Sequence, residues 1–262
     1  MMISVKFYYI SKYIPPRITS YYQQKIPKYI YQTMKTNYLP KDMKNSMQTW
    51  IDINPEYTYY FFDDNDCRRF ILENFDNQVL FAYDNIIPGA YKADLWRYCV
   101  LYKKGGVYVD IDMIAVTPLR NLINHDDEFI SCRDHDPRAI FNAFICCKPG
   151  HPFLKTTIDY IVHLIHNHYY GENCLDITGP LAFGKAIKII LKNNNPIFDI
   201  GKQNINDFIF KLFDHRLGTE YIINDEQIVF INKYKNYHRD IKKINGNVGN
   251  YCSLWKKRNV YR

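Results

Sequence analysis

Short apolar runs alternate along the chain with longer segments in which apolar residues recur every three or four positions. Strand-like runs occupy residues 26–33, 57–62 and 106–112, and helical patterns occupy 39–55, 65–75 and 88–104. Farther on, a strand pair is expected over 128–133 and 139–147, followed by a helix over 151–170 and a second helix through Leu191. Because strands and helices alternate, we predict an α/β fold whose sheet has substantial parallel character.

The helical segment 88–104 carries boundary signals at both ends. Pro88 stands near its start, Lys103 and Lys104 lie in its last turn, and Gly105 follows directly. Proline is common at helix starts, basic side chains favour helix C-termini, and glycine is common just beyond them. We therefore expect a helix that leads directly into a Gly-Gly turn and a short strand.

The chain is long enough for one large domain. Its 262 residues are 47% hydrophobic, and they can bury a full-sized core. No internal linker separates two folding units. We predict a single domain over residues 26–262, preceded by an N-terminal extension over residues 1–25.

The charge of the chain indicates an anionic partner. The net charge is +7, which suits a nucleotide diphosphate, nucleic acid or an acidic membrane surface, and charge alone does not choose among these. The seven cysteines show no C-x-x-C spacing, so reduced and mostly buried thiols are the favoured interpretation.

The sequence predicts a cytoplasmic or otherwise intracellular location. No stretch reaches the ~20 apolar residues of a transmembrane helix, and the N-terminus lacks the apolar core of a signal peptide. The basic, aromatic N-terminal segment could make a peripheral membrane contact, although a packed or disordered tail is favoured.

Two aspartates follow the apolar run of the third strand-like segment. Asp110 and Asp112 are two residues apart, and such residues share one face if the strand continues through them. Mg²⁺ and Mn²⁺ prefer oxygen ligands and commonly share them with phosphate groups. The triplet alone is a weak signal because it also occurs on surface strands and turns, but it predicts a site for a metal ion with a diphosphate.

A second pair lies on the preceding helix. Asp94 and Arg97 are three residues apart and can share one helix face. Arginine suits a phosphate or a carboxylate, whereas aspartate suits ribose hydroxyl groups or the arginine itself. The alternative is an ion pair on a solvated face, which contributes only tenths of a kcal/mol.

Residues 93–112, ADLWRYCVLYKKGGVYVDID, closely resemble the D-x-x-R-Y, L-x-x-x-G-G-x-Y-x-D-x-D block of DXD-containing sugar transferases. These include the Och1-type mannosyltransferases, the α-1,4-galactosyltransferases and, more distantly, the large clostridial glucosylating toxins. The resemblance continues in IPKYIYQT at 26–33, HPFL at 151–154 and TGP at 178–180. It implies a GT-A-type fold with a single Rossmann-like mixed sheet flanked by helices.

The resemblance also implies roles for individual residues. Asp110 would contact the nucleotide sugar and reach the metal partly through water, and Asp112 would be the direct metal ligand. Asp94 and Arg97 would contact the ribose and sugar of the donor. Tyr108 would line the nucleotide pocket, and Gly105-Gly106 would allow a tight backbone turn, with Gly106 among the donor-binding residues.

The C-terminal segment NYCSLW, residues 250–255, resembles a toxin segment that closes over metal and diphosphate. This implies Asn250 as a metal ligand, Ser253 as a further metal or phosphate contact, and Trp255 as a donor to the leaving phosphate. Asn250 departs from the pattern, since the toxins have an acid there and other relatives often have a histidine. His238 could serve as a ligand instead, although a structural role is favoured for it.

The predicted function is a metal-dependent, retaining glycosyltransferase that uses Mn²⁺ or Mg²⁺ and a UDP- or GDP-sugar donor. Asp110, Asp112, Arg97 and Trp255 are the expected catalytic residues, and the acceptor would be a glycan, a lipid or a protein. Nucleic acid is not expected as a partner. Two alternatives stay open: a metal-dependent nucleotidyl or phosphodiester-transfer enzyme, and a catalytically weak nucleotide-sugar-binding protein.

Overall fold

The computed structural model describes residues 5–20, 22–192, 195, 197–246 and 250–262. Its helices are α1 (Lys41–Ile53), α2 (Asp64–Asn74), α3 (Asn77–Asn85), α4 (Gly89–Lys104), α5 (Pro152–His166), α6 (Pro180–Leu191), α7 (Tyr237–Asn245) and α8 (Tyr251–Lys256), with a 3-10 turn at Leu119–Asn121. Its strands are β1 (Phe7–Tyr9), β2 (Tyr13–Ile14), β3 (Tyr29–Thr33), β4 (Tyr38–Pro40), β5 (Thr58–Phe62), β6 (Gly106–Val109), β7 (Ile114–Ala115), β8 (Phe129–Arg133), β9 (Ile140–Cys147), β10 (Gly201–Ile205), β11 (Phe208–His215), β12 (Tyr221–Asn224) and β13 (Gln227–Ile231).

One large mixed sheet organises the molecule. Its strand order is β2-β5-β3-β6-β9-β8-β11-β12-β13-β7, and β10 pairs with β11 beside this path. Strand β3 runs parallel to β5 and β6, and β8 runs parallel to β11. Strand β9 is antiparallel to both β6 and β8, so β6 and β8 point the same way. The carboxyl ends of β3, β5, β6, β8 and β11 therefore meet at one edge of the sheet.

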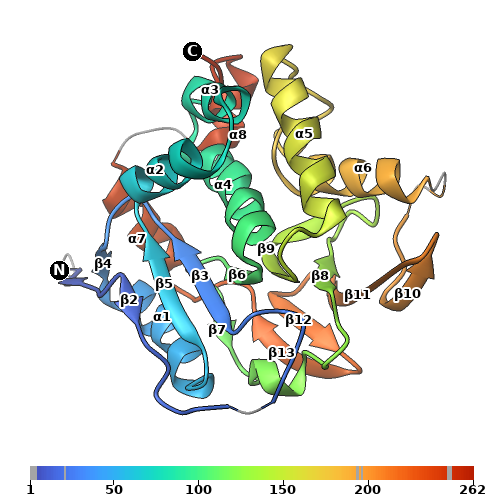
Figure 1. The fold of residues 1–262 in the computed structure, drawn as a ribbon. Helices are drawn as coiled ribbons and strands as arrows, with labels where there is room; N and C mark the ends of the chain where they lie inside the picture. Colours follow the sequence, from blue (N-terminus) through green and yellow to red (C-terminus); the bar gives the residue numbers. More distant parts are fainter. Residues whose placement is uncertain (1–4, 21, 193–194, 196, 247–249) are drawn as a thin grey trace.

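Helices cover both faces of this sheet (Figure 1). Residues of α2 to α6 build one buried cluster against the sheet, and residues of α1 build the other against the opposite face. Side chains of α8 pack on the first cluster, and side chains of α7 pack on the second. The predicted α/β fold with a mixed sheet flanked by helices is confirmed.

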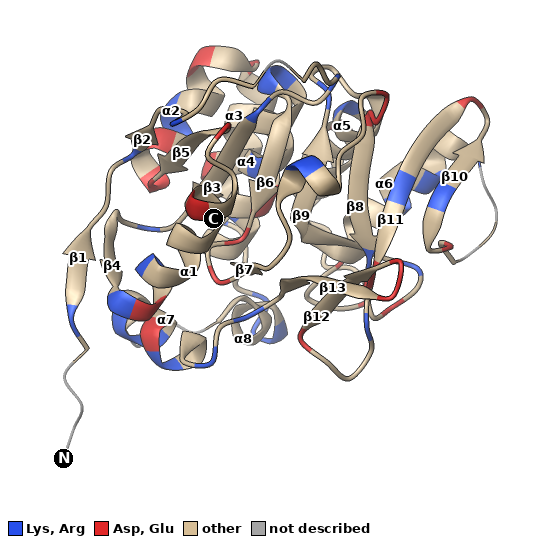
Figure 2. Ribbon diagram, turned by 90° about the horizontal axis from the view of Figure 1, so that it is seen from below, with Lys and Arg blue, Asp and Glu red and all other residues tan. Residues whose placement is uncertain are grey.

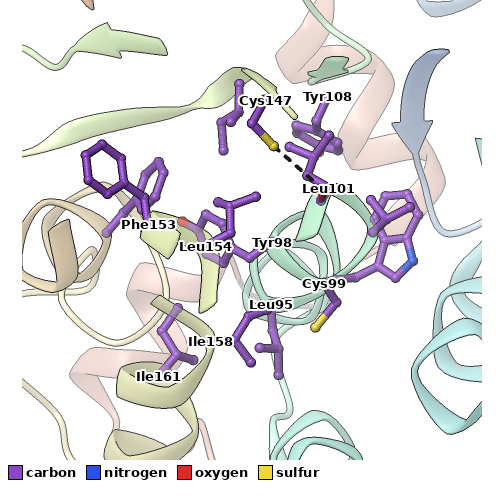
Figure 3. Close-up of a cluster of buried hydrophobic side chains, with 14 of the residues drawn as sticks. Leu95, Tyr98, Cys99, Leu101, Tyr108, Cys147, Phe153, Leu154, Ile158 and Ile161 are labelled. Carbon is purple, nitrogen blue, oxygen red and sulfur yellow. Dashed lines mark hydrogen bonds between the residues drawn. The ribbon is translucent and has the colours of Figure 1, made fainter. Parts of the chain in front are cut away.

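Helix α4 is the central element of the first cluster. Apolar residues lie all around it, as is typical of a helix buried between other layers. Figure 3 shows Leu95, Tyr98 and Leu101 of this helix among side chains of α5 and the sheet, including Leu154 and Ile158. Because the middle of α4 is enclosed, its buried polar residues Asp94 and Arg97 face other protein groups or the functional site.

Most predicted elements are present at nearly the expected positions. The helices expected at 39–55, 65–75 and 88–104 are α1, α2 and α4, and the strand pair is β8 with β9. Helix α3 was not predicted. It begins after Asp76, and the carboxylate of Asp76 accepts hydrogen bonds from the N–H groups of Gln78 and Val79. The helix expected over 151–170 is shorter, since α5 ends at His166.

The described residues before position 26, which are 5–20 and 22–25, contact the rest of the fold. Strand β1 pairs with β4, and β2 adds to the edge of the large sheet beside β5. The side chain of Lys12 forms ion pairs with Asp63 and Asp66 at the start of α2. A packed tail is thus what the structure shows, and a membrane contact of this segment has no support.

The expectation that all seven cysteines are reduced is wrong for two of them. Cys174 and Cys252 form a disulfide with their Cα atoms 5.2 Å apart, although 78 positions separate them in sequence. Sequence spacing gave no sign of this pair because the fold alone brings α8 next to the loop before α6. The other five cysteines are free and buried, as predicted. Disulfides persist mainly in oxidising compartments, so this pair speaks against the reducing compartment that we expected.

Basic residues lie on several separate elements of the fold. Figure 2 shows Lys and Arg on β10 and β11 at one end of the molecule and on α7 at the other. Among the described residues, no helix is long and apolar enough to cross a bilayer.

Candidate active site

The candidate site lies where the C-terminal end of β6 meets the buried face of α4. Asp94 and Arg97 come from α4, Tyr108 comes from β6, and Asp110 and Asp112 follow that strand. Hydrogen bonds and ion pairs connect the first four of these residues into one network. The solvated-face alternative for Asp94 and Arg97 is therefore wrong, since both residues are buried.

Asp94 is a fully engaged buried carboxylate. One of its oxygens accepts a hydrogen bond from the Asn142 side chain at 2.9 Å and lies 3.1 Å from a guanidinium nitrogen of Arg97. The other oxygen accepts a hydrogen bond from the Thr178 hydroxyl at 2.8 Å. Burial raises the pKa of Asp94 to about 6, and the charge of Arg97 opposes that rise. With these partners in place, Asp94 holds Arg97 in position.

Arg97 connects helix α4 to residues 110–113, which follow β6 and are called the acidic turn below. Its Nη1 donates to the carbonyl of Asn142 at 2.8 Å and lies 3.2 Å from a carboxylate oxygen of Asp110. The guanidinium also lies over the ring of Tyr108, 4.4 Å from the ring centre. Burial disfavours the charged form, but the charges of Asp110 and Asp94 more than offset it and raise the pKa of Arg97. One buried cation thus serves two carboxylates.

The two aspartates of the D-x-D triplet lie in a turn rather than on a strand face. Strand β6 ends at Val109, and the N–H of Met113 donates to the carbonyl of Asp110 at 3.1 Å to close the turn. The prediction that the strand continues through residue 112 is therefore wrong. The inference that Asp110 and Asp112 share one face of a strand is wrong for the same reason. Asp110 accepts a hydrogen bond from the Tyr108 hydroxyl at 2.6 Å, and its side chain is 34% exposed.

Helix α1 holds this turn from the opposite face of the sheet. The carbonyl of Met113 accepts hydrogen bonds from the Ser46 hydroxyl at 2.8 Å and the Trp50 indole N–H at 2.7 Å. The backbone of Asp112 is fixed as well, because its carbonyl accepts a hydrogen bond from the N–H of Tyr234 at 3.0 Å. These buried contacts explain why the chain leaves the strand after Val109.

Asp112 is a buried carboxylate without an ion-pair partner among the described residues, although its own backbone N–H and the charges of Lys233 and Arg97 partly favour its charged form. It is 7% exposed, and no side chain among the described residues donates a hydrogen bond to its carboxylate. Burial, followed by the charge of Asp110, raises the pKa of Asp112 to about 8, while the charge of Lys233 opposes the rise. Two adjacent carboxyl groups, one of them buried and only partly compensated, fit a hard divalent cation with oxygen ligands.

Several residues of the site gave no clear signal in the sequence. Asn142 was hidden in the strand AIFNAFICC, where a single polar residue in an apolar run is the one available hint. Tyr237 and Lys233 come from the C-terminal region, and burial together with the charges of Asp112 and Asp110 raises the pKa of Tyr237. Lys233 is thus the nearby cation that acts on Asp112.

Gly106 begins β6 and lies close to β3. It has a φ of +106°, and a Cβ atom at this position would come within 2.9 Å of the carbonyl oxygen of Tyr29. Any larger residue would push β3 and β6 apart. The contribution of Gly106 to donor binding therefore stays a prediction, whereas its place in the packing of the two strands is clear.

The three C-terminal candidates lie together on α8. Asn250 is the N-cap residue, and its side-chain oxygen accepts a hydrogen bond from the N–H of Ser253 at 2.9 Å. The hydroxyl of Ser253 donates to the carbonyl of Asn250, and the indole N–H of Trp255 donates to the carbonyl of Tyr170. All three polar groups have protein partners here, so their roles toward metal and phosphate stay predictions. His238 lies on α7 with its ring 5.5 Å from that of Tyr237.

Helix α8 nevertheless faces the site through Tyr251. The ring of Tyr251 packs 5.6 Å from that of Tyr91, near the start of α4. Burial and then the charges of Asp94, Asp110 and Asp134 raise the pKa of Tyr251. The helix therefore stands near the acidic turn.

The Cys174–Cys252 disulfide fixes α8 in this place, and opening it should lower stability. We expect a reductant to lower the free energy of unfolding by about 2–4 kcal/mol, because the cross-link restricts the unfolded chain. Thermal unfolding of the wild type, with and without reductant, measures this. A Cys174→Ser/Cys252→Ser double variant is the control, and reductant should leave its melting temperature unchanged. An equal response of the two proteins would contradict the prediction.

Comparison with known proteins agrees with this geometry. Residues 40–129, which include α4 and the acidic turn, match the family model described as the glycosyltransferase sugar-binding region containing DXD motif. The match covers about a third of the chain. The family resemblance read from residues 93–112 is thus confirmed.

Curated relatives of this DXD-containing region are named glycosyltransferases. The chain is 32% identical to inositol phosphoceramide mannosyltransferase 3 of Schizosaccharomyces pombe over 60% of its own length and 43% of the relative. It is 35% identical to the initiation-specific alpha-1,6-mannosyltransferase of Candida albicans, over 56% of this chain and 45% of that one. An uncharacterized glycosyltransferase of Acanthamoeba polyphaga mimivirus is 28% identical, over 67% of this chain and 69% of that protein. The chain thus spans less than half the length of the first two relatives.

The fold of this chain is also similar to that of a solved structure. The PaToxG glycosyltransferase superposes with a TM-score of 0.50 and 19% identity, over 64% of this chain and 70% of that chain. The predicted GT-A-type α/β fold is therefore confirmed.

Proposed function

We propose that the protein is a metal-dependent, retaining glycosyltransferase that transfers a sugar from a nucleotide-diphosphate donor. The observation that carries the proposal is the buried, only partly compensated Asp112 next to Asp110, at the carboxyl edge of the sheet and inside the matched sugar-binding region. The mannosyltransferase relatives support a hexose donor and a glycan, lipid or protein acceptor.

Asp110 and Asp112 are the residues that would hold the metal ion. A Mn²⁺ or Mg²⁺ ion bound there would supply a Lewis acid for the negative charge that develops on the departing diphosphate. Asp110 is oriented for this by the Tyr108 hydroxyl and by Arg97. Asp112 is oriented through its backbone, which Tyr234 fixes. The two carboxylates are thus positioned before the donor binds, so little rearrangement of the protein would be needed during the reaction.

Arg97 would stabilise the diphosphate and sugar side of the donor. Its charge is fixed by Asp94, and Asp94 in turn is fixed by Asn142 and Thr178. Ser253 and Trp255 would add hydrogen bonds to the phosphate after α8 shifts and releases its present backbone contacts. Asn250 would complete the metal site in the same movement.

Retention of configuration is proposed because Asp94 and Asp110 are poor general bases. Each is held by Arg97 and by at least one further hydrogen bond, so neither is free to take a proton from an acceptor. A mechanism in which the leaving phosphate accepts that proton needs no such side chain. The anomeric configuration of the product, measured by NMR, tests this assignment.

A panel of UDP- and GDP-sugars tests the function as a whole. We expect chelator-treated protein to be inactive and Mn²⁺ or Mg²⁺ to restore hydrolysis or transfer of one sugar nucleotide. The control is the same panel with nucleoside triphosphates and single-stranded nucleic acid. Turnover of those substrates instead would favour the nucleotidyl or phosphodiester alternative, and donor binding without turnover would favour a binding protein.

A further inference from the structure

A second group of metal-ligating side chains lies at the same edge of the sheet as the acidic turn but comes from other strands. Asp134 and His135 follow β8, and His215 ends β11, so the parallel pairing of these strands brings the three residues to the same edge of the sheet. One ligand atom from each of the three lies within 4.8 Å of the others. The group draws on different strands from the D-x-D triplet, and the proposed function makes no use of it.

His215 is the residue that needs an explanation. It is 6% exposed, and neither of its ring nitrogens has a hydrogen-bond partner. Its ring packs against that of Phe141 at 4.5 Å and stacks on that of His135 at 3.7 Å. A buried polar atom without a partner is costly and rare, which indicates a ligand that satisfies it.

Asp134 also lacks a positive partner. No Lys or Arg among the described residues forms an ion pair with it, and the N–H of His135 donates to one of its oxygens at 2.6 Å. The neighbouring Arg133 and Arg216 lie 3.6 and 3.5 Å from carboxylate oxygens of Asp214 instead. The carboxylate is therefore available to a cation.

We propose that Asp134, His135 and His215 bind a divalent transition metal of the zinc class. Two imidazole nitrogens and one carboxylate oxygen are a common donor set for Zn²⁺, and three protein ligands leave a position for water or a substrate oxygen. Zinc bonds of about 2.0–2.1 Å place tetrahedral ligands roughly 3.3 Å apart. The exposed side chain of His135 can rotate to close the group to that size, while the buried His215 stays fixed.

The test uses the full chain with an Asp112→Asn substitution, which removes metal binding at the acidic turn. The protein is treated with a chelator, dialysed without reductant so that the disulfide stays closed, and titrated with Zn²⁺ against a colorimetric chelator. We expect one zinc ion per chain. His135→Ala and Asp134→Asn in this background should each weaken zinc binding at least ~10-fold.

His125→Ala is the matched control. His125 is also exposed and lies next to an acid, with its Nδ1 2.7 Å from Asp126, but it is not part of the group. Its replacement should leave zinc affinity unchanged. Because His135 is exposed, its variant should melt at the temperature of the parent in the absence of metal. An absence of zinc binding in the parent, or equal affinity of the parent and the His135→Ala variant, would overturn the proposal.

Discussion

Replacing Asp112 with asparagine should lower sugar-transfer activity by about 10²–10³-fold and at the same time stabilise the metal-free protein. An amide has the size of the carboxyl group but no charge, so it should bind the cation that neutralises the leaving diphosphate much more weakly. Loss of one such electrostatic contact typically costs this much in rate. Steady-state kinetics at saturating Mn²⁺ measure the first effect.

The second effect follows from the raised pKa of Asp112. Burial and the charge of Asp110 raise this pKa to about 8 in the folded protein, above its ordinary value of 3.8. Between these two values the folded protein binds the proton more tightly than the unfolded chain does, so stability falls as pH rises from about 4 to about 8. Asp112→Asn removes this loss and should raise the free energy of unfolding by roughly 1–3 kcal/mol at pH 8.

Asp126→Asn is the control for both measurements. The side chain of Asp126 is 83% exposed and lies beside His125, so the same chemical change should alter neither activity nor stability. An Asp112→Asn variant that retained full metal-dependent turnover would refute the metal assignment. One that was inactive and also less stable than the wild type at pH 8 would refute the account of its burial.

Replacing Arg97 with alanine should destabilise the protein by about 3–5 kcal/mol. The change leaves Asp94 and Asp110 without their shared cation, and removing one partner of a buried ion pair typically costs this amount. Activity should be lost as well, because Asp110 would no longer be held beside Tyr108. Urea unfolding at pH 7 measures the stability change.

Arg68→Ala provides a matched comparison. Arg68 forms a two-bonded ion pair with Asp84 at distances of 2.8 and 2.6 Å, but both side chains are largely solvent-accessible. Its loss should cost no more than ~1 kcal/mol. If the two arginine variants were equally stable, the buried network around α4 would not have the importance that we assign to it.

Local patterns in the sequence were sufficient to predict much of the fold. Helix α4 was predictable because Pro88, its two C-terminal lysines and Gly105 are local signals, and the same holds for β8 and β9. Helix α3 was missed because its cap at Asp76 follows α2 with little separation. The end of β6 was misplaced because the contacts that turn the chain come from α1, more than 60 positions away.

The candidate site was predictable only where its residues are close in sequence. Asp94, Arg97, Tyr108 and Asp110 fall within one short block, and the structure links them. Asn142 and Thr178 complete the same network from distant segments. Thr178 belongs to the TGP match at 178–180, but the sequence does not show that either residue contacts Asp94. His215 gave no signal either, since it meets Asp134 and His135 only because β11 pairs with β8.

The carbonyl of Met113 accepts hydrogen bonds from both Ser46 and Trp50, and these contacts affect which substitutions the protein tolerates. The acidic turn is anchored to a helix on the opposite face of the sheet, so inactivating substitutions should appear on that face as well. A mutational scan would then find two separate sensitive regions, one around the ligands and one beneath them on α1. Efforts to alter donor choice should leave that lower anchor untouched and vary the C-terminal helices instead.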